Sequence, residues 1–282
     1  MLEDLAKMAG EAENCALELY KDLAQPSARV IGNALGTTLE FLVTPFTWLQ
    51  LPNGKTKINI QHRLQQYADK MQQVPQEKQC EVHPELGVPI MQRLAYTTND
   101  DVAELFLDLL TSASNLDKVS LAHPSFIAII DRLSPDEAKL LKYIAENEGN
   151  VLYVDFRAKR LKEKNETLNK FDFDTSYIEL EKWHTLVARD LDLDFPDNLH
   201  MYWANLISCG LLIDGGDLGF TDMDEKYNEI AEYNKIVEVR EENVPMKYRE
   251  IQVHNSYFQI TALGAQFLDV CVLNNTESSM IN

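Results

Sequence analysis

The sequence predicts a mainly α-helical protein with an N-terminal membrane-spanning helical region and an α/β domain at its C-terminal end. Of the 282 residues, 45% are apolar and 25% are charged, which indicates a packed core rather than disorder. The stretch from Val30 to Gly54 contains one charged residue, Glu40. After Glu148 the composition changes, and short β-branched and aromatic runs appear.

The first 25 residues are expected to form an amphipathic helix, because apolar residues recur near helical spacing with acidic residues between them. The next segment, 26–57, is expected to lie in a membrane, and 58–133 to form a helical domain. We expect a mixed α/β ligand-binding domain over 134–273 and a disordered tail over 274–282.

The segment from Val30 to Gly54 carries a narrow polar stripe on an otherwise apolar helix. A helix of this length measures about 37 Å and crosses a hydrocarbon core of about 30 Å. Spacings of 4, 3, 4 and 3 place five polar residues on one stripe: Asn33, Thr37, Glu40, Thr44 and Thr47. Several copies could line a pore with this stripe, and a ring of Glu40 would favour cations. The alternative is a soluble helix with its stripe in solvent, which a kink at Pro45 would favour.

Helical patterns resume near Asn59, run to Met71, and predict two or three further helices over 84–133. A strong helix start follows, because Ser134 can cap the helix, Pro135 suits its first position and Glu137 completes a capping box. The helical domain therefore leads directly into the mixed domain.

The C-terminal part is expected to combine strands and helices. Val151–Phe156 has strand-like content, whereas 177–191 and 199–212 are expected to be helical. Residues 236–261 are expected to form two or three short strands, with a turn at His254-Asn255-Ser256. A last helix over 261–272, with Gly264 and Phe267, completes an order that resembles a winged-helix domain. The expected recognition helix, 199–209, has no Lys or Arg, which argues against reading duplex DNA in the major groove.

Basic residues are concentrated at two places in an otherwise acidic chain. The chain has 26 Lys and Arg against 45 Asp and Glu, a net charge of −19, so any nucleic-acid site must be a local basic patch. Two groups are candidates for binding phosphates. The first consists of Arg157, Lys159, Arg160, Lys162 and Lys164, and the second, which adds an aromatic ring, of Lys247, Tyr248 and Arg249. The alternative is that both form ordinary surface ion pairs.

Enzymatic motifs are missing from the sequence. It contains no P-loop, GxSxG or HExxH pattern, and its four cysteines form no CxxC pair. Asp190, Asp192 and Asp194 alternate, which on a strand could bind a metal, but a solvated loop is favoured. We therefore expect a protein without catalytic residues, metal or cofactor. A hydrolase or nuclease would depend on these aspartates alone.

Three segments together resemble the abortive-infection alpha family of bacterial phage-defence proteins. They are PSARVIGNALGTTLEFLVTPFTWL (26–49), YTTNDDVAELFLDLLTSAS (96–114) and HPSFIAIIDRLSPDEAKLL (123–141). The layout is also similar to membrane effectors of the two-gene Hailong defence system. That resemblance implies an oligomeric ion channel, for example a tetramer, in the inner membrane. Most of the chain would then lie in the cytoplasm. It also implies a partner nucleotidyltransferase whose single-stranded DNA oligomers hold the channel shut.

The basic residues Lys55, Lys57 and Arg63 follow the apolar segment, and the positive-inside rule then places the large C-terminal part in the cytoplasm. The alternative function is a soluble phage-defence regulator whose winged-helix-like domain binds a protein or nucleic acid. The two differ in whether the protein stays with membranes.

Overall fold

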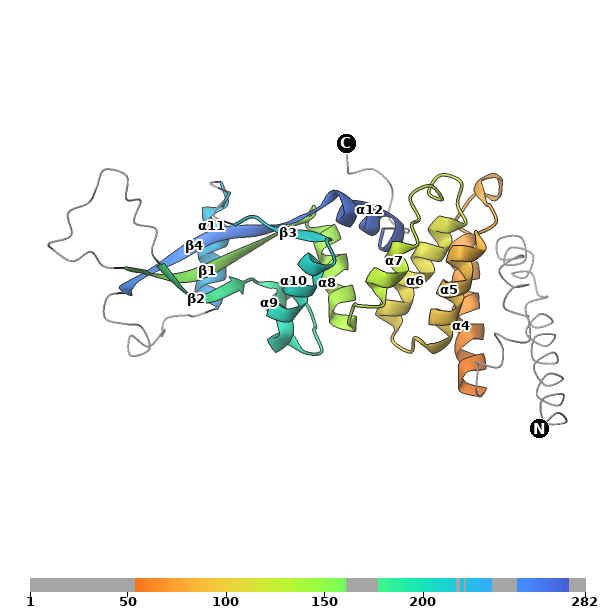
Figure 1. Cartoon of the computed structure of the whole chain (residues 1–282), viewed down its shortest axis with the longest axis horizontal. Coiled ribbons are helices and arrows are strands. Elements are labelled where there is room, and N and C mark those ends of the chain that lie inside the picture. The colour runs from red at the N-terminus through yellow and green to blue at the C-terminus, as the bar shows by residue number, and fades with distance from the viewer. Residues whose placement is uncertain (1–53, 161–176, 217–218, 221, 235–247, 274–282) are drawn as a thin grey trace. The chain divides into compact units, whose positions relative to one another are not determined.

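The structure is a computed structural model that describes residues 54–160, 177–216, 219–220, 222–234 and 248–273 (Figure 1). The predicted helix 1–25, nearly all of the membrane segment 26–57 with its polar stripe, and the tail 274–282 lie outside the described residues. The chain forms two compact units. The helical unit contains the described residues up to Leu141 and those from Gln266 on, and the sheet unit comprises 142–265.

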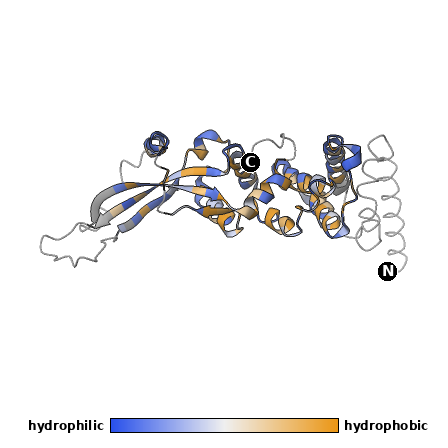
Figure 2. Ribbon diagram, turned by 90° about the horizontal axis from the view of Figure 1, so that it is seen from above, coloured by the Kyte–Doolittle hydropathy of each residue, from blue (hydrophilic) through white to orange (hydrophobic). Residues whose placement is uncertain are grey.

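The helical unit contains α4 (Gly54–Met71), η1 (Gln76–Lys78), α5 (Pro84–Tyr96), α6 (Asp100–Ala113), α7 (Ser125–Ile130) and the first part of α8 (Pro135–Glu146). Helix α6 is at its centre, and Leu105, Phe106 and Leu109 on it are buried. Hydrophobic and hydrophilic residues alternate along these helices (Figure 2), as expected for a bundle with one buried face per helix.

The helix start predicted at Ser134 forms in this unit. The Ser134 N–H donates to Glu137 Oε2 at 2.7 Å, and the Glu137 N–H donates to Ser134 Oγ at 3.3 Å, which is the predicted capping box of α8. Asn99 caps α6 by accepting the Val102 N–H. His123 Nδ1 accepts the Ser125 N–H at 3.1 Å at the first residue of α7.

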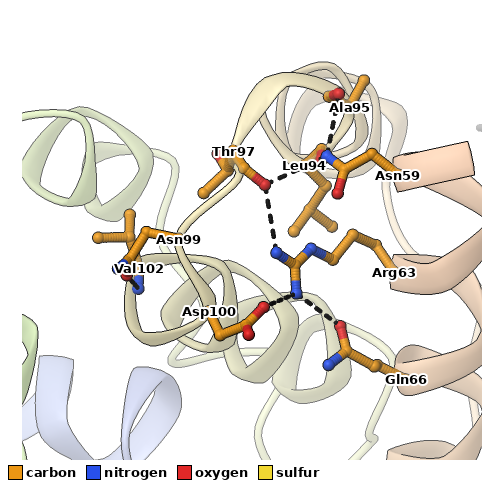
Figure 3. A network of polar contacts seen from close by, with 9 residues as sticks. All are labelled: Asn59, Arg63, Gln66, Leu94, Ala95, Thr97, Asn99, Asp100 and Val102. Carbon is orange, nitrogen blue, oxygen red and sulfur yellow. Dashed lines mark hydrogen bonds and ion pairs between the residues drawn. The ribbon is translucent and has the colours of Figure 1, made fainter. Parts of the chain in front are cut away.

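A buried arginine joins α4 to the connection between α5 and α6 (Figure 3). Only 2% of the Arg63 side chain is exposed, and its guanidinium donates to Asp100 at 2.7 Å and to the Thr97 carbonyl at 3.3 Å. Asn59, one turn earlier on α4, donates to three carbonyls of the same connection, those of Leu94, Ala95 and Thr97. These bonds satisfy backbone carbonyls at the end of α5.

The sheet unit contains four antiparallel strands in the order β2-β1-β4-β3. They are β1 (Asn150–Arg160), β2 (Tyr177–His184), β3 (Leu212–Asp214) and β4 (Tyr248–Ile260), with α9 (Val187–Asp190), η2 (Pro196–Asn198), α10 (Leu199–Ser208), α11 (Asp224–Tyr233) and the start of α12 (Ala262–Cys271).

Two helices cover opposite faces of the sheet. Trp203 of α10 stacks on Phe258 of β4, with ring centroids 4.8 Å apart, and Tyr153 of β1 packs against the same ring. On the other face, Val154 and Phe156 form a buried cluster with Tyr227 and Ile230 of α11. The alternation along β1 thus supplies both cores.

The first turn of α12 passes close to the backbone of the segment before β3. A Cβ atom on Gly264 would lie 2.2 Å from the Leu211 carbonyl oxygen, so only glycine fits there. Farther along, Phe267 is buried in the helical unit and meets Phe126 edge-on at 5.4 Å.

The predicted fold class is wrong. The described chain is a mixed helix and sheet protein rather than a mainly α-helical one with a winged-helix-like domain, because β1 and β4 pair along strands of 11 and 13 residues. Among the described residues, no helix is both long and apolar enough to cross a membrane. The expected turn His254-Asn255-Ser256 lies inside β4, since all three residues pair with β1.

Residues 177–184 are also a strand rather than the predicted helix. Their glutamates and leucine favour helices, but pairing with β1 overrides this intrinsic preference. The alternation of Ile178 and Leu180 with Glu179 and Glu181 was the period-2 signal of a strand.

Replacing the buried arginine should destabilise the helical unit. We expect Arg63→Ala to lower the free energy of unfolding by about 2 to 4 kcal/mol, because it removes hydrogen bonds to a partly buried carbonyl and leaves a cavity. Urea unfolding followed by circular dichroism measures this. Lys78→Ala is the control, since Lys78 pairs with Asp117 at the surface and should change little. Equal stability of both variants would contradict the role given to Arg63.

Candidate ligand-binding face of the sheet

The strand register brings the two predicted basic groups together. Arg160 at the end of β1 pairs with Tyr248 at the start of β4, and Lys159 pairs with Glu250. Arg157, Lys159, Arg160, Tyr248 and Arg249 therefore share one end of the sheet, although they come from distant parts of the sequence. Lys162, Lys164 and Lys247 lie outside the described residues.

Arg157 already has partners in this structure. Its guanidinium carbon lies 4.5 Å from the centroid of the Tyr177 ring on β2, and Nη2 lies 3.4 Å from Asp155 Oδ2. Only 12% of the Arg157 side chain is exposed, so it packs against its neighbours rather than extending into solvent. A cation over an aromatic face contributes about 0.5 to 2 kcal/mol, depending on its solvation.

Asp155 is a buried carboxylate in the middle of β1. Its Oδ1 accepts the backbone N–H of Trp183 at 2.9 Å, and the register places His254 of β4 opposite it. Burial raises the pKa of the Asp155 carboxyl, whereas the Trp183 N–H, Arg157 and His254 lower it. Asp155 is not among the site residues predicted from the sequence, although a single acid inside the apolar run VLYVDF was a usable signal.

Trp183 is held at both its backbone and its ring. Its φ of 60° lies in the left-handed region that non-glycine residues rarely adopt, next to a register shift between β1 and β2. Its Nε1–H donates to Asp214 Oδ2 at 3.3 Å. Asp214 Oδ1 also accepts the Tyr153 hydroxyl and, at 2.8 Å, the Gly216 N–H. Burial, with Asp214, raises the pKa of Tyr153.

Two histidine rings border this arrangement. His184 lies 3.1 Å from Glu181 Oε2 and meets the exposed His200 ring edge-on at 6.0 Å. Burial lowers the pKa of His184, and Glu181 opposes that shift. A half-buried imidazole of this kind is neutral at pH 7 and can hydrogen-bond without adding charge.

The possible metal ligands in the described part of the chain are not clustered. No group of three or more His, Cys, Asp or Glu residues there is arranged to hold a metal ion. Of the alternating aspartates, Asp190 lies on α9 rather than on a strand, and it pairs with Arg189 at 2.7 Å. The residues gathered on this face instead offer cationic groups, aromatic rings and fixed hydrogen-bond acceptors.

Comparisons with known proteins give one family match. A family model described as abortive infection alpha matches residues 55–271. No curated protein sequence matches the chain. One solved structure, an uncharacterised protein from the hydrocarbon-degrading marine bacterium Alcanivorax borkumensis SK2, is 14% identical, with a TM-score of 0.34, and the match covers 55% of this chain and 94% of that one.

The buried carboxylate should make stability depend on pH in a defined direction. With its pKa raised in the folded state, Asp155 binds more protons folded than unfolded, so it favours folding at low pH and loses that effect as pH rises. Asp155→Asn keeps an acceptor for the Trp183 N–H and lacks the charge. We expect the stability of this variant relative to wild type to rise between about pH 4 and pH 7.

Urea unfolding at a series of pH values measures this difference. Asp197→Asn, an exposed change on η2, is the control and should show no such trend. A wild-type protein that gains stability over Asp155→Asn as the pH rises would contradict the effect assigned to burial.

Proposed function

The chain belongs to the abortive infection alpha family, and from this membership, which indicates a role in phage defence, we propose that it is an antiphage effector controlled by a ligand bound to its sheet unit. The proposed ligand is a single-stranded DNA oligomer made by a partner nucleotidyltransferase. The bound oligomer keeps the effector inactive in healthy cells, which requires that it bind the inactive state more tightly than the active one.

The observation that carries this proposal is the meeting of the two basic groups through the β1–β4 register. Arg160 lies opposite Tyr248, and Lys159 pairs with Tyr177 of β2 on the other side. Cationic side chains beside aromatic rings are the combination that binds single-stranded nucleic acids, because the cations hold phosphates and the rings stack on bases.

Local charge matters here because the whole chain is acidic. Glu179 of β2 pairs with Arg157 in the register, but its carboxylate lies 2.6 Å from Lys182 Nζ, which offsets its charge. We call the end of the sheet that carries Arg157, Lys159, Arg160, Tyr248 and Arg249 the basic end. A homo-oligomer would repeat the basic end around its axis, so that modest contacts in each subunit add up along one oligonucleotide.

The effector step is predicted from sequence alone. A cation pore in the bacterial inner membrane would be lined by Asn33, Thr37, Glu40, Thr44 and Thr47, all outside the described residues. In that arrangement the lipid bilayer is a partner and most of the chain is cytoplasmic.

The pore hypothesis predicts that toxicity depends on the polar stripe. Thr44→Trp should abolish growth arrest by filling the lumen, and Glu40→Gln should lower cation preference in planar bilayers. Leu39→Ala, which lies off the stripe, is the control. Protein released from membranes by a carbonate wash, with both stripe variants still toxic, would rule the pore out.

Reversing charge at the basic end should weaken binding of single-stranded DNA. We expect Lys159→Glu with Arg160→Glu to reduce affinity for an oligothymidine and to lower the steepness of its salt dependence by about 0.7 in log K per log salt for each lost phosphate contact. Fluorescence anisotropy at several salt concentrations measures both quantities. In cells, the variant should arrest growth without phage.

Lys226→Glu is the matched control, because Lys226 is exposed on α11, which covers the opposite face from Trp203. Nucleic acid that binds wild type and both variants equally would refute this site. No nucleic acid in protein purified with its native gene partner would refute the ligand.

A further inference from the structure

Trp183 is held in place by two carboxylates from other strands, one at its backbone and one at its ring. Asp155 of β1 accepts its backbone N–H at 2.9 Å, and Asp214 of β3 accepts its ring N–H at 3.3 Å. The residue keeps a φ of 60°, a strained conformation that persists only where surrounding contacts determine it. The Trp183 side chain is only partly buried, so part of its ring borders solvent.

The ring lies at the edge of the part of the sheet that α10 covers. It meets Phe258 edge-on at 5.7 Å, and Phe258 in turn is stacked by Trp203 of α10. His200, three residues before Trp203 and therefore on the same side of α10, lies 6.3 Å from the Trp183 ring at 39°. His200 is exposed, so two rings from two elements border the solvent here.

Trp183 lies on the face of the sheet that carries Arg157. Tyr153, Asp155 and Arg157 alternate along β1 and share one face. Trp183 donates directly to Asp155, and it is linked to Tyr153 through Asp214, which accepts from both. Tyr177, under the Arg157 guanidinium, is six positions from Trp183 on β2, about 20 Å at 3.3 Å per residue. Several stacked nucleotides span that distance, at about 3.4 Å each.

We infer that Trp183, with His200 beside it, is a base-stacking position for the single-stranded oligonucleotide. This inference depends on the proposed function and adds to it the place where a nucleobase is held. The ligand group that fits here is a flat ring rather than a cation. The two oxygens of Asp214, the carboxylate that a cation would approach, already accept three hydrogen bonds, from Tyr153, Trp183 and Gly216. What remains open to a ligand is aromatic surface.

The test compares an oligothymidine with an abasic oligonucleotide of the same length, which has the same phosphates without bases. Wild type should bind the oligothymidine about tenfold more tightly. Trp183→Gly should lose most of this preference through weaker binding of the oligothymidine, while its affinity for the abasic strand stays that of wild type, because phosphate contacts are unchanged. Glycine adopts a φ of 60° without strain, so this variant removes the ring without disturbing the backbone conformation at position 183.

Trp183→Phe keeps a ring and should retain most of the preference, with thermal unfolding as the check on both variants. A folded Trp183→Gly protein that keeps the full wild-type preference for the oligothymidine would overturn the stacking role. Wild type that binds both strands equally would overturn it too, while leaving the phosphate site in place. Wild type that binds neither would refute the proposed function, and this inference with it.

Discussion

The register between β1 and β4 is the constraint on which the sheet unit depends. It extends from Asn150 opposite Gln259 to Arg160 opposite Tyr248. A shift by one residue would turn Val154 and Phe156 away from α11 and Tyr153 away from α10, losing both cores together. The same register gathers the basic groups, so the energy that fixes the fold also fixes the candidate site.

The segments that resemble the family have structural roles wherever the structure describes them. Asn99 caps α6, His123, just before α7, accepts the Ser125 N–H, and Ser134 with Glu137 forms the capping box of α8. Arg63 binds the α5–α6 connection in the same unit. These residues fix the helices of the helical unit, whereas the groups proposed to meet a ligand are in the sheet unit, on Trp183 and the end of the sheet near Arg157.

Local signals could be predicted from the sequence, and pairings could not. The capping box at Ser134 and the strand at Val151 need only neighbouring residues, and both are present. The continuity of β4 through His254-Asn255-Ser256 depends on β1 as a partner, as does the strand over 177–184. The basic residues were visible as groups, but the Trp183–Asp214 bond joins positions whose proximity no spacing reveals.

In the proposed function, single-stranded DNA lies along the β1, β2 and β4 strands of the sheet unit. Ultraviolet cross-linking of an oligothymidine to the full chain, followed by mass spectrometry of the linked peptides, tests this placement most directly. We expect links in peptides that contain Tyr177, Trp183 and Tyr248, lost when unlabelled oligothymidine competes. Competed links confined to peptides of α4, α5 and α6 would contradict it.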